Sequence, residues 1–282
     1  MSEIQRFPAM GCEVLVAGAD EDELAAVREL FRERERRFSR FSERSELQRV
    51  NRRAGRPVVV SEDFAAMVRL SLWAAEQTQG LVDPTIGAAL IAAGYDRDFR
   101  LLAQGMPSSP AAAPRRSDIS LCGRLLTVPP GTALDLNGVV KSATVDEALA
   151  LLRGGGWVSA GGDMATSGGV GVALPGGGHV HLAAGGIATS GRTRRTWSDG
   201  RHHLIDPATG RPSRSAWEQV TACGATCVDA DVAAKAALLL GESGPAWLDE
   251  RGIPGRFVAG EGRIAVNLAW AAAVQEPEAA CT

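Results

Sequence analysis

Several features that mark secreted, membrane-spanning or nucleic-acid-binding proteins are missing from this sequence. The chain has five cysteines, an odd number at scattered positions, which favours a reduced protein over a disulfide framework. It contains no run of about 18 apolar residues, the length that a membrane span requires. Residues 1–6 do not begin a basic segment followed by an apolar stretch, so no secretory signal is expected. These absences predict a cytoplasmic protein without a membrane span.

An excess of positive charge and a cluster of metal ligands are also missing. The chain has 30 Lys and Arg against 33 Asp and Glu, a net charge of −3, so no nucleic-acid partner is expected. Cys223 and Cys227 lie four residues apart without a histidine close by, which is a weak signal for zinc. The strongest signals for a nucleic-acid-binding or zinc-binding protein are therefore absent.

Glycine, by contrast, is abundant. The 33 glycines indicate many turns and close approaches of the backbone. The length of 282 residues suits one large domain with two joined lobes. We predict that this domain covers residues 1–275, that the Ala-, Pro- and Ser-rich segment 102–118 is a flexible surface loop, and that residues 276–282 form a frayed tail.

The pattern of apolar residues predicts an α+β fold. Capping residues at Asp20 and Ser61 precede apolar residues at helical spacing. Residues 156–190 alternate short apolar stretches with glycines, which favours hairpins over a doubly wound parallel sheet. We expect one two-lobed domain with mixed or antiparallel sheets flanked by helices. The predicted helices are 20–37, 45–51, 61–79, 142–152, 229–240 and 244–251, and the predicted strands are 12–18, 119–121, 124–128, 157–159, 164–166, 170–172, 179–182, 216–222 and a pair within 256–268.

Two segments combine glycines with groups that bind phosphate or hydroxyl oxygens. In residues 135–146 (DLNGVVKSATVD), Lys141 follows a glycine turn and stands at the start of a predicted helix. A lysine beside a helix N-terminus suits a phosphate, although a turn with a surface lysine explains the segment as well. In residues 159–163 (SAGGD), paired glycines permit a ligand to approach, and Asp163 is an available acceptor for a hydroxyl. A tight β-turn is the simpler explanation of that segment.

Two further segments carry titratable side chains. In residues 202–212 (HHLIDPATGRP), His203 lies three residues before Asp206, and a histidine at neutral pH can transfer protons or contact phosphate. In the predicted helix that contains Asp231 and Lys235, these two side chains share one face. The pair is either a simple intrahelical ion pair or, with Asp231 as an oxygen ligand, part of a magnesium site.

In this order along the chain, the segments resemble the ApbE-type family of FAD:protein FMN transferases. No single segment is specific, but the series covers nearly the whole sequence. The matching segments are 10–11 (MG), 38–51, 80–87 (GLVDPTIG), 135–146, 160–163 (AGGD), 189–191 (TSG), 203–212 and 230–241.

The resemblance implies a reaction and a set of site residues. Such enzymes bind FAD with a divalent metal, usually Mg²⁺, and pass FMN to a Thr or Ser hydroxyl of an acceptor flavoprotein, releasing AMP. A metal and nearby lysines suit this chemistry because charge builds up on the phosphates. By position, the resemblance assigns catalysis to His203 and the supporting Asp206; FAD contacts to Met10, Phe41, Leu81, Val82, Asp83, Lys141, Glu147, Asp163 and Ile205; and the metal site to the Thr144 carbonyl, Asp231 and the Lys235 position.

The sequence departs from the family pattern at the metal site. The family usually has Thr one helical turn after its metal-binding Asp, where this chain has Lys235, and an ammonium cannot ligate Mg²⁺. Either Lys235 swings away and water completes the site, or it partly replaces the cation, or the metal is lost. Other departures are Phe41 for Tyr, Asn137 and Ser142 for Gly, and Ser159 for Asn. FMN transfer is the leading hypothesis, with an FAD pyrophosphatase and a catalytically weak FAD-binding protein as alternatives.

Overall fold

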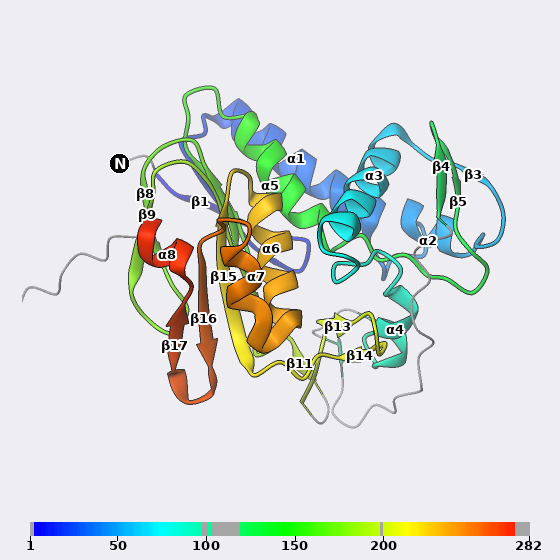
Figure 1. Ribbon diagram of the computed structural model, residues 1–282. Coiled ribbons are helices and arrows are strands. Elements are labelled where there is room, and N and C mark those ends of the chain that lie inside the picture. The colour runs from blue at the N-terminus through cyan, green and yellow to red at the C-terminus, as the bar shows by residue number, and fades with distance from the viewer. Residues whose placement is uncertain (1–2, 98–100, 103–118, 198–199, 274–282) are drawn as a thin grey trace, which may run out of the picture.

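A computed structural model describes residues 3–97, 101–102, 119–197 and 200–273 (Figure 1). The predicted surface loop lies outside the described residues except for residue 102, and so does the predicted tail 276–282. None of the helices in the described ranges is long and apolar enough to cross a membrane.

The centre of the fold is an eight-stranded sheet. All its neighbouring strands are antiparallel, and β1 to β2 and β6 to β7 are tight hairpins. The predicted α+β class with antiparallel pairing is therefore confirmed. In spatial order the strands are β1 (Gln5–Ala9), β2 (Cys12–Ala17), β6 (Trp157–Ala160), β7 (Asp163–Thr166), β10 (Gly185–Gly191), β15 (Trp217–Gly224), β16 (Gly255–Ala259) and β17 (Ile264–Val266).

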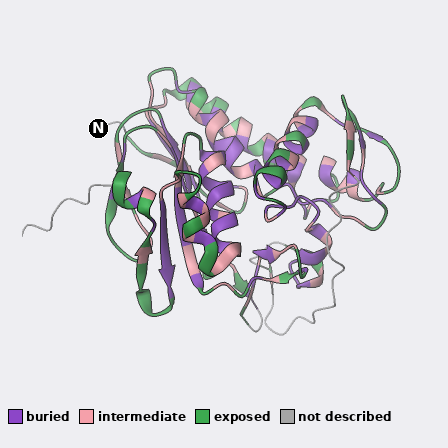
Figure 2. Ribbon diagram, viewed as in Figure 1, coloured by how far each residue is buried: buried purple, intermediate pink, exposed green. Residues whose placement is uncertain are grey.

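Three helices cover one face of this sheet. Helices α5 (Val140–Ala150) and α6 (Cys227–Leu240) pack directly on the strands, and α1 (Glu21–Phe38) packs on α5 (Figures 1 and 2). Their inward faces are buried, which supplies the hydrophobic stabilisation of this lobe. A capping box between Asp20 and Glu23 begins α1, because both side chains satisfy backbone N–H groups of the first turn.

The close packing of α6 depends on a small residue in β10. A Cβ atom placed on Gly186 would lie 2.3 Å from the backbone nitrogen of Cys227, the first residue of α6. Asp146 of α5 then accepts hydrogen bonds from the N–H groups of Cys227 at 2.8 Å and Val228 at 3.0 Å. These bonds fix the first turn of α6 against the second half of α5.

A second lobe packs beside the first. It contains α2 (Glu46–Asn51), α3 (Glu62–Gln77), α4 (Gly87–Ala92) and a three-stranded sheet of β3 (Val58–Val59), β5 (Leu125–Thr127) and β4 (Ser120–Cys122). The two lobes share one hydrophobic core, in which Phe38 stacks on Phe64 with ring centroids 5.4 Å apart. Val228 and Val232 of α6 belong to the same cluster, so the lobes are joined and not independent.

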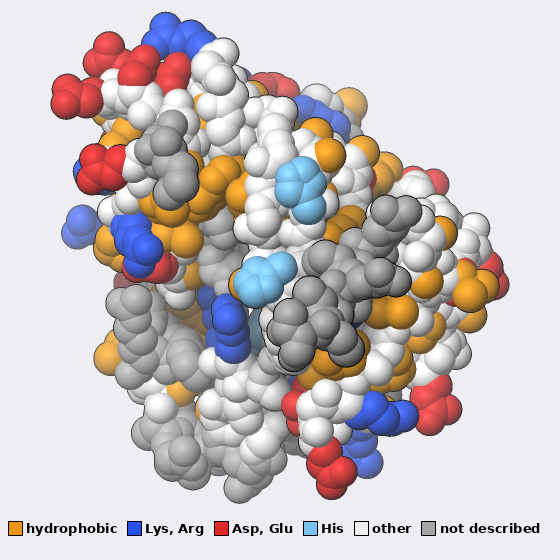
Figure 3. Space-filling model, turned by 90° about the vertical axis from the view of Figure 1, so that its left-hand side faces the viewer, with side chains coloured by type: hydrophobic (Ala, Val, Ile, Leu, Met, Phe, Trp, Pro, Cys, Tyr) orange, Lys and Arg blue, Asp and Glu red, His pale blue; other side chains and the backbone are white. Residues whose placement is uncertain are grey.

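Short elements complete the fold. The hairpin β8 (Val170–Ala173) and β9 (His179–Leu182) packs through Val180 and Leu182 against Met164 and Ile187 of the large sheet. On the side of the molecule shown in Figure 3, acidic and basic side chains are scattered among apolar ones, in keeping with the small net charge. The remaining elements are α7 (Gly244–Asp249), α8 (Leu268–Ala273), β11 (Thr196–Trp197) with β12 (Arg201–His202), and β13 (Ile205–Asp206) with β14 (Arg211–Pro212).

Candidate active site

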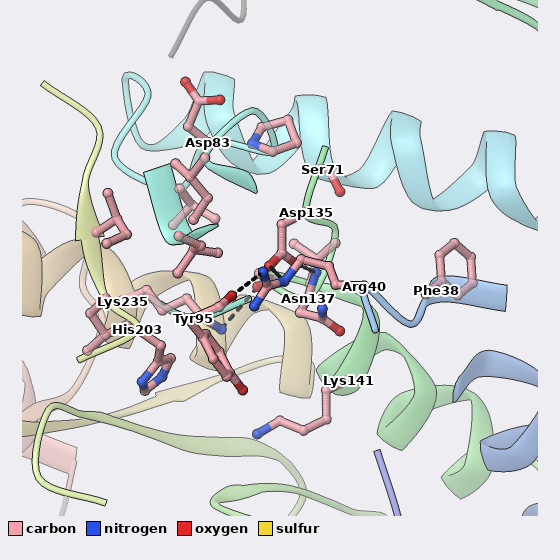
Figure 4. A pocket seen from close by; sticks show the side chains of 18 of the residues that line it. Phe38, Arg40, Ser71, Asp83, Tyr95, Asp135, Asn137, Lys141, His203 and Lys235 are labelled. Atoms are coloured by element: carbon pink, nitrogen blue, oxygen red, sulfur yellow. Dashed lines mark hydrogen bonds and ion pairs between the residues drawn. The ribbon is translucent and has the colours of Figure 1, made fainter. Parts of the chain in front are cut away.

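A cavity of about 250 Å³ lies between the two lobes (Figure 4). Its wall is built from segments that are far apart in the sequence: the turn between β1 and β2, the end of α1, the segment after α3, the start of α5, Arg195, residues 203–205 and α6. Apolar side chains supply much of the wall, and basic and acidic side chains from several segments supply the rest. Such a cavity suits a ligand with a flat apolar part and an anionic part.

One wall of the cavity is a buried cation among aromatic rings. The guanidinium of Arg40 lies 4.6 Å from the ring centroid of Tyr95 and 4.9 Å from that of Phe41. Its Nε forms a 2.8 Å ion pair with Oδ2 of Asp135, and its Nη1 donates to the carbonyl oxygen of Tyr95 at 2.8 Å. Both charged side chains are buried, so this pair holds the loop after α1 against the segment before α5 (Figure 4).

The segment after α3 forms another part of the wall. Leu81, Val82 and Asp83 all line the cavity. Asp83 is buried, and its Oδ1 accepts hydrogen bonds from the N–H of Thr85 at 2.8 Å and from its hydroxyl at 2.6 Å. The carboxylate therefore fixes the turn that leads into α4.

Lys141 in the first turn of α5 points into the cavity (Figure 4). Among the described residues no side chain forms a cap hydrogen bond at the N-terminus of this helix, whose positive end favours an anion. The Nζ of Lys141 lies 3.0 Å from Oδ2 of Asp163. Burial lowers the pKa of Lys141, but the carboxylates of Asp163 and Asp231 outweigh it and raise that pKa above its usual value. Lys141 is therefore a fixed positive charge at neutral pH.

The predicted pair of Asp231 and Lys235 is present in α6. The Nζ of Lys235 forms an ion pair with Oδ1 of Asp231 and donates a hydrogen bond to the carbonyl oxygen of Gly138 at 3.0 Å. The other carboxylate oxygen, Oδ2, accepts from the hydroxyl of Ser142 at 2.9 Å. Asp231 is buried, whereas Lys235 lines the cavity.

His203 lines the cavity near these cations. Its Nδ1 is buried and has no hydrogen-bond partner within the part of the chain that the structure describes. Burial lowers the pKa of His203 well below its usual value, and the positive charge of Arg195 lowers it further. The imidazole is therefore neutral at neutral pH. Its neighbour His202 is different, because its Nε2 lies 2.9 Å from the carbonyl oxygen of Ser213.

Five predicted site residues lie behind the wall rather than on it. Asp206 fixes the turn after β13, where it accepts from the N–H of Ala208 at 2.9 Å and the hydroxyl of Thr209 at 3.1 Å. Glu147 forms a 2.6 Å ion pair with Arg34. The predicted residues on the wall are Met10, Phe41, Leu81, Val82, Asp83, Lys141, His203, Ile205 and Lys235, and those outside the lining set are Thr144, Glu147, Asp163, Asp206 and Asp231. Of the latter, Asp163 and Asp231 still touch the cavity's lysines.

The sequence pattern did not single out Arg40 and Arg195, two of the arginines that line the cavity. Arg40 lies in a segment rich in Arg and Glu, which looks like a solvated surface. Arg195 lies in the 192–197 segment, whose charged residues carry no motif. The proximity of Arg40 to the phenylalanine at position 41 was a usable signal, since arginines stack on aromatic rings.

Comparison with known proteins agrees with this architecture. The sequence model of the ApbE family matches residues 10–257. An FAD:protein FMN transferase of Klebsiella pneumoniae is 28% identical over 284 residues, covering 88% of this chain and 81% of the relative. The chain belongs to the ApbE family, and the resemblance noted in the sequence is confirmed.

Solved structures of this family share the fold. The ApbE protein of Thermotoga maritima superposes with a TM-score of 0.85 at 23% identity and covers 98% of this chain and 100% of its own. The flavin transferase ApbE of Vibrio cholerae, solved also as a histidine-to-glycine variant, gives 0.80 at 21% identity, over 96% of this chain and 99% of its own. The apo form of the flavinyl transferase ApbE of Pseudomonas stutzeri superposes with a TM-score of 0.80 at 20% identity, covering 95% of this chain and 96% of its own.

Proposed function

We propose that the protein transfers the FMN unit of FAD to a Thr or Ser hydroxyl of an acceptor flavoprotein and releases AMP. The observation that carries this proposal is the cavity itself, which joins an apolar, aromatic wall to a group of cations and a neutral histidine. FAD combines a flat apolar ring with a pyrophosphate. Family membership and the name of the Klebsiella relative point to the same reaction.

In this reaction the hydroxyl oxygen of the acceptor attacks the phosphorus on the FMN side of the pyrophosphate. A new P–O bond to the acceptor forms, the bond to the bridging oxygen breaks, and AMP leaves as a phosphate monoester. We assign the hydroxyl proton to His203, which lines the cavity as a neutral imidazole and whose Nδ1 has no partner among the described residues. Lys141 and Arg195 line the cavity as the cations that offset the charge of the phosphates.

The remaining wall residues are assigned to holding the flavin. Met10, Leu81, Val82 and Ile205 provide an apolar surface, and Phe41 provides a ring for stacking. Met10, which has a positive φ of 49°, lines the cavity from the β1–β2 hairpin. Asp163 and Asp206 act through their neighbours, Asp163 on Lys141 and Asp206 on the turn after His203.

The Mg²⁺ ion that the family resemblance implies does not fit the oxygen atoms as they stand. Both carboxylate oxygens of Asp231 are in use, one with Lys235 and the other with Ser142. Thr144 is fully buried, its hydroxyl donates to the carbonyl oxygen of Val140 at 2.7 Å, and its own carbonyl lies inside α5. Among the described residues no group of three His, Cys, Asp or Glu side chains is placed to hold a metal.

The test is incubation of the purified protein with FAD and an acceptor flavoprotein of the Klebsiella relative, with either Mg²⁺ or EDTA. We expect a covalent flavin adduct on the acceptor, seen by in-gel fluorescence, and one AMP per adduct. AMP and free FMN without an adduct would establish the pyrophosphatase alternative. Bound FAD without any product would establish a binding protein. The cytoplasmic location is also part of this proposal, and cell fractionation tests it.

A further inference from the structure

The ammonium of Lys235 lies among oxygen atoms that would otherwise suit a hard cation. Its Nζ contacts a carboxylate oxygen of Asp231, which lies in α6, and the carbonyl oxygen of Gly138, which lies in the turn before α5. A carboxylate and a backbone carbonyl are the donor types that Mg²⁺ prefers. The lysine side chain is largely buried, with 17% of its surface exposed, so it is held in this place and not extended into solvent.

The geometry leaves one donor of Lys235 for the cavity. An ammonium has three N–H donors, and Asp231 and Gly138 account for two of them. Because Lys235 lines the cavity, the third donor is available to a ligand there. Lys141, which also lines the cavity and is paired with Asp163, offers a second cation to the same ligand. Two lysines that are each anchored by a buried carboxylate form a site for a group with two phosphates.

We propose that Lys235 is a built-in cation that takes the place of the divalent metal, so that this protein binds the pyrophosphate of FAD without Mg²⁺. The inference rests on the proposed function for the identity of the ligand. Of the possible outcomes of the Thr-to-Lys departure, the structure favours replacement over displacement, because the lysine has not swung away from Asp231.

The test compares FAD binding by the wild-type protein and two variants in EDTA and in Mg²⁺, followed by quenching of flavin fluorescence. Lys235→Thr removes the ammonium and supplies an oxygen, whereas Lys235→Met removes the ammonium and supplies none. For the wild-type protein we expect the same FAD affinity, within about twofold, in both buffers. For both variants in EDTA we expect a loss of about tenfold, the size of one charge-assisted hydrogen bond. Mg²⁺ should restore binding to Lys235→Thr and not to Lys235→Met.

Binding of Mn²⁺, followed by electron paramagnetic resonance in the absence of FAD, gives a second measurement. We expect binding to Lys235→Thr and none to the wild-type protein at the same Mn²⁺ concentration. Thermal unfolding checks that each variant is folded. If either variant does not fold, Lys235→Gln takes its place in the same comparison. A wild-type protein that needs Mg²⁺ to bind FAD, or that binds Mn²⁺ as tightly as Lys235→Thr, overturns the inference.

These outcomes are separate from those of the proposed function. An adduct that forms in EDTA supports both proposals, and an adduct that forms only in Mg²⁺ supports FMN transfer and refutes the built-in cation. If no adduct forms in either buffer while FAD binding is equal in both, the proposed transfer fails and the built-in cation stands.

Discussion

The buried ion pair of Arg40 and Asp135 allows a sharp prediction about the wall of the cavity. The two side chains are 5% and 6% exposed, and Nε lies 2.8 Å from Oδ2. Removing one partner of such a pair costs about 3–5 kcal/mol, because the other charge stays buried without compensation. Asp135→Ala also removes the acceptor for the N–H of Asn137, now 2.7 Å from Oδ1. We therefore expect Asp135→Ala to lower the free energy of unfolding by at least about 3 kcal/mol.

Urea unfolding followed by circular dichroism measures this loss. The matched control is Arg69→Met, which breaks a 3.0 Å pair with Glu62 whose side chains are 51% and 70% exposed. Exposed pairs contribute about 0–1 kcal/mol, so this control should unfold within about 1 kcal/mol of the wild-type protein. FAD affinity should fall in Asp135→Ala, because Asp135 and Arg40 line the cavity. It should stay unchanged in Arg69→Met, because Arg69 and Glu62 are not among the residues that line it.

A double variant distinguishes a lost pair from a general loss of packing. In Arg40→Met with Asp135→Leu both charges are gone, and a buried pair replaced by apolar residues is often neutral. The double variant should therefore be more stable than Asp135→Ala alone. If the double variant is instead destabilised as much as Asp135→Ala or more, the loss does not come from an unpaired charge and the reasoning is refuted.

Three further predictions concern the cations, the base and the packing. His203→Ala should slow AMP release by about 10²-fold or more with little change in FAD affinity. Since burial lowers the pKa of His203, the activity of the wild-type protein should be level at neutral pH and fall only well below pH 6.5. A decline in activity above pH 7 would contradict this role. Lys141→Met should weaken FAD binding by about tenfold or more, with Lys141→Arg retaining most of it, as titration would show. Gly186→Ala should lower the free energy of unfolding in urea by about 1–3 kcal/mol, because its Cβ would collide with the start of α6. The control Gly171→Ala should lower it less, because a Cβ at position 171 would have no atom within 4 Å.

Local signals in the sequence were enough to predict most of the helices. Asp20 and Ser61 mark the starts of α1 and α3 because their side chains accept hydrogen bonds from the first-turn N–H groups in both cases. The missed helix α4 begins at Gly87, and its N-cap residue, Ile86, forms no side-chain cap. Its place is set by tertiary contacts, since a Cβ on Gly87 would lie 2.6 Å from the carbonyl oxygen of Ala133.

Strand β10 shows why part of the sheet was missed. Its sequence, GGIATSG, has three glycines and little apolar alternation, so it does not look like a strand. Its burial comes from neighbours on both sides, β7 and β15, and from α6, which needs the small residue at position 186. The strand β1 was missed for a related reason, because only its hairpin with β2 places it in the sheet.

The same distinction applies to the candidate site. The spacing of Asp231 and Lys235 was enough to predict their contact, since residues four apart share a helix face. The contact of Lys235 with Gly138 joins residues 97 positions apart, and the pairing of Arg40 with Asp135 is comparably distant. Contacts of this kind depend on how the lobes and helices pack, which no local pattern in the chain determines.

The packing of α5 against α6 also makes Lys235 part of the scaffold as well as of the site. Asp146 of α5 accepts a hydrogen bond from the first N–H group of α6. One turn further along α6, Asp231 accepts from Ser142, and one turn beyond that, Lys235 donates to the carbonyl oxygen of Gly138. Each of these contacts joins the two helices, so a change at Lys235 alters their packing together with the charge of the cavity. Lys235→Met should therefore lose stability as well as FAD affinity, whereas Lys235→Thr with Mg²⁺ should regain both, because an ion that bridges Asp231 and the Gly138 carbonyl would restore the lost connection. A gain of FAD affinity without a gain of stability would show that the metal binds elsewhere in the cavity.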